Sequence, residues 1–225
     1  MRTVRSVAAF EPGHRRTGRL VRTLLLALLV GGTNPAVESN APPPRWVPEP
    51  PAGKKADPRL KVEGDRATFR EEGLVLEIEL LDAEHRALFL ASAGVPGEDP
   101  FTTEPGERPF VTFLVRLENG TKETVRMRPE SVLFVSKRPI DMAFPCDETC
   151  LWMLVERAGY SREQRDHLLR ATLSTPLELA SGGRISKLLV YNRVPERYRM
   201  FTLDFGAIDQ IEKAFRFSLP YGLSK

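Results

Sequence analysis

Two cysteines are the residues of this chain best suited to chemistry. Cys146 and Cys150 are its only cysteines and are separated by three residues. In a helical turn, a rise of about 1.5 Å per residue places their Cα atoms about 6 Å apart, within the range that a disulfide spans. Such a pair usually forms a disulfide in an oxidising compartment, so the sequence favours a structural bond.

Two other uses of the cysteine pair stay open on sequence grounds. Met142 and Met153 flank the pair, and sulfur atoms are the soft ligands that copper(I) prefers. A thiol at the start of a helix also has a lowered pKa, which favours thiol–disulfide exchange. The alternative prediction is therefore a copper(I)-binding or thiol-redox protein of the cell envelope that uses Cys146 and Cys150.

The other reactive residue types form no recognisable catalytic motif. His14, His85 and His167 occur in no zinc-protease or haem-attachment pattern, and no Gly-x-Ser-x-Gly motif is present. We therefore predict a non-enzymatic protein with no catalytic residue and no cofactor. The candidate contacts to a partner are side chains of a predicted helical insertion and of a basic cluster suited to an anionic lipid or wall polymer, namely Trp152, His167, Arg193, Arg197 and Arg199.

Residues 1–32 have the composition of an export leader. They carry six arginines and one acid, and they end in the apolar run Thr23–Val30 followed by Gly31-Gly32. A basic segment, a short apolar run and small residues are typical of a secretory signal peptide, and an uncleaved membrane anchor is the alternative. Both alternatives, a cleaved signal peptide and a retained anchor, predict an exported protein in the periplasm, at the cell surface or anchored to the membrane.

The leader also accounts for the basic character of the chain. The formal charge of the whole sequence is +3, but residues 1–32 contribute +5, which leaves −2 for the remainder. A nucleic-acid-binding domain needs a basic surface, so the charge excludes nucleic acid as the partner.

Residues 33–65 are predicted to form a disordered, proline-rich linker. Eight prolines lie between Pro35 and Pro58, and proline cannot donate the backbone hydrogen bond that a sheet requires. Such a segment acts as a semi-rigid spacer. Trp46 is the exception within it. The neighbouring prolines are its favoured contact, and the following domain or a partner is the alternative.

Residues 66–225 are long enough for one domain with its own core, and their pattern is mainly that of strands. Apolar residues alternate along Leu74–Leu81 and along Phe110–Glu118. Asn119-Gly120 predicts a tight hairpin turn into a strand at 123–128, and we favour this over the N-glycosylation acceptor that Asn119-Gly120-Thr121 also matches.

A helical insertion interrupts the strands at about 147–173. Asp147 and Ser161 are suited to cap two consecutive helices, and Gln164 completes a capping box with Ser161. Gly159 lies where the first helix should end. The sequence therefore predicts an αα-hairpin, which is the best candidate for a specific contact. A shorter helix is predicted at 83–93.

The segment Phe110–Thr121, FVTFLVRLENGT, resembles the central strand of a family of exported bacterial immunoglobulin-like domains of uncharacterised function. Gly182–Tyr191 and Phe201–Phe205 are similar to later strands of the same domains. The resemblance implies an immunoglobulin-like β-sandwich in the cell envelope and supplies no catalytic residues. We therefore expect a mainly β, non-enzymatic binding or assembly module with an inserted αα-hairpin, and another envelope protein or wall component as its partner.

Overall fold

The computed structural model describes residues 46–49, 57–95, 97–103, 110–137, 140–192, 200–210 and 213–223. The chain divides into the units 1–41 and 42–225, and every described residue belongs to the second. The predicted leader and most of the predicted linker lie outside the described residues. Among the residues described, no helix is long and apolar enough to cross a membrane.

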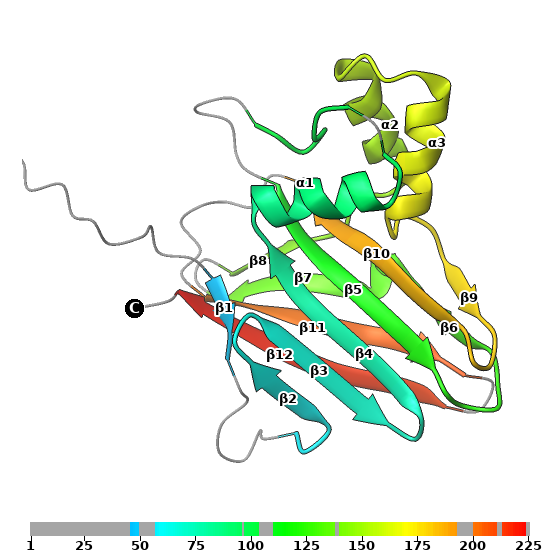
Figure 1. Cartoon of the computed structure of the whole chain (residues 1–225). Helices are drawn as coiled ribbons and strands as arrows, with labels where there is room; N and C mark the ends of the chain where they lie inside the picture. The colour runs from blue at the N-terminus through cyan, green and yellow to red at the C-terminus, as the bar shows by residue number, and fades with distance from the viewer. Residues whose placement is uncertain are drawn as a thin grey trace, which may run out of the picture. The chain divides into compact units, whose positions relative to one another are not determined.

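Two antiparallel sheets face one another, as expected for a β-sandwich (Figure 1). The five-stranded sheet has the order β10-β5-β4-β3-β2, with bounds Arg184–Tyr191, Val111–Asn119, Leu74–Leu81, Arg66–Glu71 and Leu60–Glu63. The seven-stranded sheet runs β1-β12-β11-β6-β9, with β7 on β11 and β8 on β7. Its strands are Trp46–Pro48 (β1), Val125–Met127 (β6), Val132–Lys137 (β7), Ile140–Ala143 (β8), Leu177–Leu179 (β9), Met200–Asp209 (β11) and Ala214–Leu223 (β12).

The predicted alternation along the strands of the five-stranded sheet is confirmed. In β5, Val111, Phe113, Val115 and Leu117 point into the core between the sheets. The core contains a group of aromatic rings in which Phe134 and Phe201 stack with centroids 4.0 Å apart, and Phe201 and Tyr221 stack at 4.8 Å. Across the two sheets, the Phe69 ring of β3 stacks on the Phe217 ring of β12 with centroids 4.4 Å apart, so aromatic contacts also hold the sheets together.

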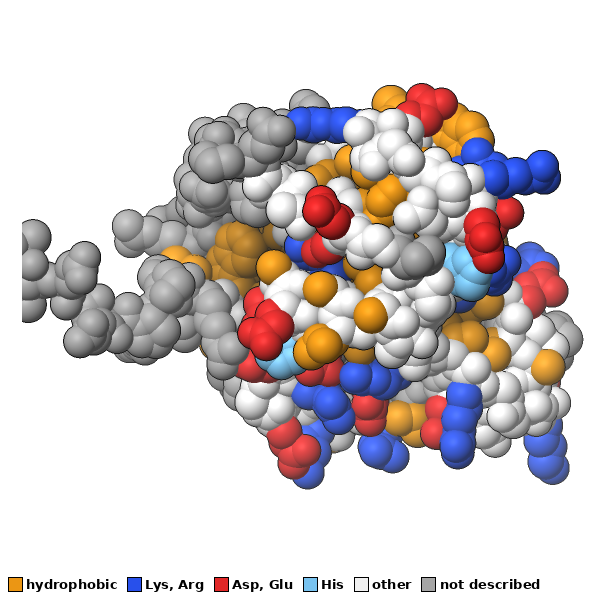
Figure 2. Space-filling model, turned by 45° about the horizontal axis from the view of Figure 1, so that its top comes forward, with side chains coloured by type: hydrophobic (Ala, Val, Ile, Leu, Met, Phe, Trp, Pro, Cys, Tyr) orange, Lys and Arg blue, Asp and Glu red, His pale blue; other side chains and the backbone are white. Residues whose placement is uncertain are grey.

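The outer face of the five-stranded sheet changes character along its length. Three helices, α1 (Ala83–Ser92), α2 (Glu148–Arg157) and α3 (Arg162–Ala171), pack over one end of β5 and β10 (Figure 1). Beyond them, charged side chains alternate in sign on the open sheet (Figure 2). There Glu79 pairs with Arg116 at 2.9 Å and with Arg66 at 3.3 Å, which places Glu79 on a charged outer face.

Two strands lie within residues 33–65, where the composition predicted a disordered linker. β1 pairs with β12, and β2 pairs with β3. These two strands form because their side chains are buried against the domain, although the backbone propensity of the segment is low. Trp46 meets the Phe201 ring edge-on at 5.3 Å, and Leu60 is buried in the core. The ordered domain therefore begins before residue 66, and the contact of Trp46 is with the domain.

The predicted hairpin at Asn119-Gly120 is wrong. β5 and β6 belong to different sheets, so this segment is a crossing between sheets. The Asn119 side chain is fully buried and donates to the carbonyls of Glu123 at 2.7 Å and Leu179 at 2.8 Å. Gly120 fits because a Cβ atom there would lie 2.7 Å from the Gly73 carbonyl oxygen. Since its amide is buried and engaged, Asn119 is inaccessible to glycosylation in the folded protein.

Candidate functional site

The helical hairpin forms as its capping residues predict. The Asp147 carboxylate accepts a hydrogen bond from the Cys150 amide at 2.8 Å at the start of α2. At the start of α3, Ser161 and Gln164 exchange the two hydrogen bonds of a capping box. Gly159, between the helices, has a φ of 67°, a conformation that side chains strongly disfavour. Local chemistry therefore fixes both helix starts and the turn between them.

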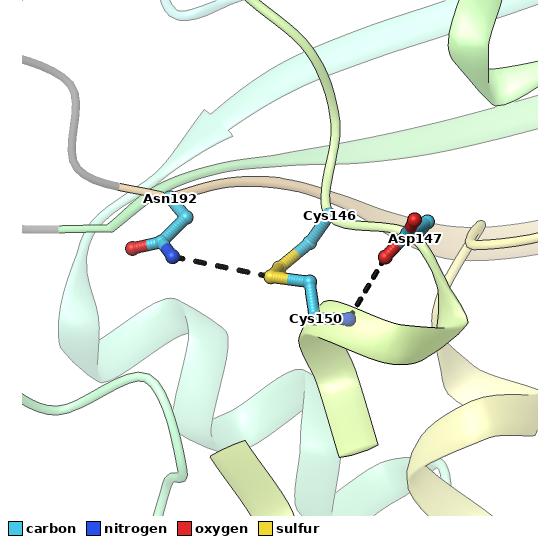
Figure 3. The surroundings of a disulfide bond; sticks show 4 residues. All are labelled: Cys146, Asp147, Cys150 and Asn192. Carbon is cyan, nitrogen blue, oxygen red and sulfur yellow. Dashed lines mark hydrogen bonds between the residues drawn. A yellow bond between two sulfur atoms is a disulfide. The ribbon is translucent and has the colours of Figure 1, made fainter. Parts of the chain in front are cut away.

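The two cysteines form a disulfide at the base of this hairpin (Figure 3). Their Cα atoms are 5.3 Å apart, close to the separation predicted for one helical turn. The Cys146 amide donates to the Val190 carbonyl at 2.6 Å, and the Asn192 amide group lies 4.0 Å from the Cys150 sulfur. The bond therefore ties the first turn of α2 to a segment hydrogen-bonded to β10.

The inner side of the hairpin is apolar and buried. Leu151 and Val155 of α2 and Leu168 of α3 pack with Leu114 of β5 and Leu188 of β10. Further anchoring comes from the chain after α3, where the Leu173 amide donates to the Leu188 carbonyl at 2.7 Å. The hairpin is thus a fixed part of the fold.

The outer side of α2 presents large apolar side chains to solvent. Met153 is 61% exposed, and Trp152 is 40% exposed. The Trp152 ring lies over the Arg165 guanidinium of α3, 4.0 Å from its carbon to the ring centroid. A cation–π contact of this kind holds the ring in place while one side stays accessible. Exposed apolar side chains are also visible over the helical layer in Figure 2.

A cleft of about 430 Å³ lies between the helical hairpin and the loop at 97–103. Its apolar lining includes Phe110 and Leu154, and its polar lining includes Tyr160, Arg157 and Gln164. The Tyr160 hydroxyl donates to the Glu98 carbonyl and so joins the hairpin to the loop. Burial, with the nearby acids Asp99 and Glu98, raises the pKa of Tyr160 to about 12. This phenol therefore stays a hydrogen-bond donor at neutral pH.

A buried ion pair holds the loop side of the cleft. Arg86 of α1 lies 2.7 Å from Asp99, and the two side chains are 7% and 8% exposed. The second Asp99 oxygen accepts from the Phe101 amide at 2.9 Å. Sequence reasoning missed this pair. The available signal was the spacing of Arg86 from Leu90, which places both residues on the buried side of one helix.

The structure separates several residues that the sequence singled out. Trp152 and Met153 lie on α2, whereas Met142 lies on β8 and is 57% exposed. His167 is half-buried against Gly94, where an added Cβ would be 3.2 Å from its Nδ1. It therefore packs in the contact between α3 and the end of α1. The basic cluster of Arg193, Arg197 and Arg199 lies outside the described residues.

The arrangement suits binding through side-chain contacts. Both cysteines are held in the disulfide, so neither presents a thiolate to a metal ion in this state. Within the described ranges, His, Cys, Asp and Glu form no group of three that could hold a metal ion. When the chain was compared with models of protein families, with curated proteins and with solved structures, nothing matched.

Proposed function

We propose that this protein is a non-enzymatic binding or assembly module of the cell envelope, built on an immunoglobulin-like β-sandwich. Its recognition surface is the outer side of α2 together with the cleft beside it. Its partner is another envelope protein, which contributes an apolar or aromatic side chain.

The observation that carries the proposal is the exposure of Trp152 and Met153 on a hairpin that is otherwise held rigidly. Large apolar side chains in contact with water cost free energy unless a partner covers them. Tryptophan is also among the residues that contribute most to protein–protein binding. The caps, the disulfide and the buried side of the hairpin fix these residues in advance, which lowers the entropy lost on binding.

The cleft supplies the specificity that an apolar surface lacks. A volume of about 430 Å³ lies within the range of sites that enclose a ligand group. Phe110 and Leu154 can cover an apolar side chain, while Tyr160, Arg157 and Gln164 offer polar contacts at its edge. A peptide segment that inserts one apolar residue matches this combination.

An envelope location is supported by the leader and by the cysteine pair. Residues 1–32 have the pattern of a signal peptide or anchor. The disulfide also suits an oxidising compartment, because cytosolic proteins seldom keep one.

Site-specific photo-crosslinking in the native cell tests this proposal. A photoreactive amino acid in place of Met153 should yield a discrete adduct, and Trp152→Ala should reduce its yield at least about 10-fold, as expected for a central binding residue. The matched control places the same amino acid at Leu88 of α1, which is 62% exposed and far from this surface in sequence. An absent Met153 adduct, or one insensitive to Trp152→Ala, would refute the proposed surface.

The copper(I) or thiol-redox alternative makes a different prediction. It needs both thiols reduced, so the reduced protein should bind one copper(I) ion through Cys146 and Cys150. Titration of the reduced chain with copper(I), in wild type and in the Cys→Ser variants, separates the two functions. Stoichiometric binding that requires both cysteines would favour the alternative.

A further inference from the structure

An open hollow of about 760 Å³ lies on the outer face of the seven-stranded sheet, where β11, β6 and β9 lie side by side. The register across these strands places Glu178 opposite Arg126, and Arg126 opposite Asp209, and all three line the hollow. Beside them, the Gln210 amide group donates to the Thr121 hydroxyl at 2.8 Å, just beyond the end of β5. The helices pack over the start of β5, so the hollow lies at the other end of the sandwich (Figure 1).

Cationic side chains are concentrated in this hollow. Along β6, buried residues alternate with exposed ones, which places Thr124, Arg126 and Arg128 together on the outer face. All three line the hollow. Lys213, just before β12, supplies a third cation, and two neighbouring carboxylates hold its ammonium group at 2.8 and 3.1 Å. Among the described residues that line the hollow, three cations therefore accompany two acids.

A β-bulge in β11 shapes one wall of the hollow. The register of β11 and β12 shifts within Phe205–Ile208, and Asp209 follows this shift. Gly206 lies within the bulge, where a Cβ atom would be 2.9 Å from the Ser131 carbonyl oxygen. This close approach holds the segment that follows β6, and Arg128 with it, against β11. Bulges are frequent beside binding sites because they redirect side chains.

The two ion pairs in the hollow leave hydrogen-bonding capacity unused. Arg126 donates through Nε and Nη2 to a single Glu178 oxygen, with Nε at 3.0 Å. The Nη1 group of Arg126 has no partner in the described part of the chain. Arg128 lies 3.3 Å from an Asp209 oxygen. Ion pairs that water reaches contribute little stability, so an anion of higher charge can displace these carboxylates from the arginines.

The residue types of the lining match a phosphorylated sugar. Alternate residues of one strand are about 7 Å apart, so the guanidinium groups of Arg126 and Arg128 can both reach the oxygens of one phosphate. The carboxylates of Glu178 and Asp209 only accept hydrogen bonds, and sugar hydroxyls donate them. A volume of about 760 Å³ also falls within the range of sites that hold a small molecule larger than phosphate itself.

We propose that this hollow binds a phosphorylated sugar. Arg126 and Arg128 hold the phosphate, while Glu178 and Asp209 accept hydrogen bonds from the hydroxyls. The ligand is either a soluble sugar phosphate, whose phosphate is a monoester, or a unit of a phosphate-linked glycan, whose phosphate is a diester. The site lies at the other end of the sandwich from the helices, and it is independent of the binding role proposed for α2.

Isothermal titration calorimetry of the full chain tests this binding. The probes are glucose 1-phosphate as the monoester, a diglucosyl phosphodiester, inorganic phosphate and glucose. At least one sugar phosphate should bind, and Arg126→Gln with Arg128→Gln should raise its Kd at least about 10-fold. The matched control, Arg66→Gln with Arg184→Gln, changes the net charge equally on the other sheet and should leave the Kd unchanged. Tighter binding of the monoester identifies a soluble ligand, and tighter binding of the diester identifies a polymer.

Three results would overturn the inference. The first is the absence of binding heat with either sugar phosphate. The second is inorganic phosphate binding as tightly as the sugar phosphates, because the site would then not contact the sugar. The third is an equal rise in Kd in the two double variants, which would reflect net charge alone. Equal urea midpoints verify that each variant is folded. None of these results bears on crosslinking at Met153, so failure here is distinguishable from failure of the proposed function.

Discussion

The two buried tyrosines of the core allow a paired test of how this fold treats polar groups. Tyr191 and Tyr221 are both fully buried. The Tyr191 hydroxyl donates to the Val132 carbonyl at 2.8 Å, whereas the Tyr221 hydroxyl has no hydrogen-bond partner among the residues that the structure describes. Replacing each by phenylalanine should therefore change stability in opposite directions.

The expected magnitudes follow from these contacts. Tyr191→Phe loses one buried hydrogen bond and should lower the free energy of unfolding by about 1 to 1.5 kcal/mol. Tyr221→Phe removes a desolvated hydroxyl that gains nothing in return, and should raise it by about 1 to 3 kcal/mol. The ring of residue 221 keeps its stacking on Phe201 in either case. The two variants should thus differ by at least about 2 kcal/mol.

Urea unfolding followed by circular dichroism measures both effects on the full chain. The midpoint should shift down for Tyr191→Phe and up for Tyr221→Phe, with the same slope for all variants. The double variant should show nearly the sum of the single effects, unless the hydroxyls interact. A Tyr221→Phe variant that is as destabilised as Tyr191→Phe would refute the reasoning, because the Tyr221 hydroxyl would then have a hydrogen-bond partner in solution.

Four further outcomes are expected. Burial raises the pKa of both core tyrosines, so with rising pH these tyrosines ionise in the unfolded chain before they ionise in the folded protein. The free energy of unfolding should therefore be constant below about pH 10 and fall above it. Urea midpoints that do not change up to about pH 11 would contradict this. Reducing the disulfide, or replacing both cysteines by serine, should lower the free energy of unfolding by only about 2 kcal/mol, because the loop that the bond closes is short. Calorimetry with and without reductant measures this loss, and an unchanged free energy of unfolding would contradict the prediction. Asn119→Asp, which keeps the shape but loses the two donated hydrogen bonds, should cost about 2 to 3 kcal/mol in urea unfolding, whereas the exposed Lys122→Ala should be neutral. Asp99→Leu should lower the free energy of unfolding by about 3 to 5 kcal/mol, because it leaves the buried Arg86 guanidinium without its ion-pair partner. The double variant Arg86→Leu with Asp99→Leu should recover much of this loss. Additive losses in urea unfolding would show that the two residues are not coupled.

The parts of the fold that follow from nearby residues were predictable from the sequence. The caps at Asp82, Asp147 and Ser161 and the alternation along β5 all depend on neighbours within a few residues. The disulfide was predictable for the same reason, because one helical turn sets the separation of Cys146 and Cys150. These signals located the helical hairpin and therefore the α2 surface.

The features that the sequence did not reveal depend on partners far along the chain. Asn119 was assigned to a hairpin turn because Asn-Gly is a common turn pair, but its amide bonds to Leu179, sixty residues away. Trp46 was assigned to a linker because prolines surround it, but it packs on Phe201. The cleft was missed because the segment carrying Glu98 and Asp99 meets Tyr160 only in the folded domain. A local pattern cannot distinguish these long-range contacts from solvent-exposed loops.

The pairing of β1 with β12 has a consequence for the order of biosynthesis. It joins the first strand that the structure describes to β12, so this edge of the seven-stranded sheet forms only after residues 214–223 have been synthesised. Contacts between distant parts of a chain also form slowly. A chain threaded through a channel from its N-terminus cannot complete this sheet during passage. For the exported protein that we propose, this sheet would therefore be completed only after residues 214–223 have left the channel.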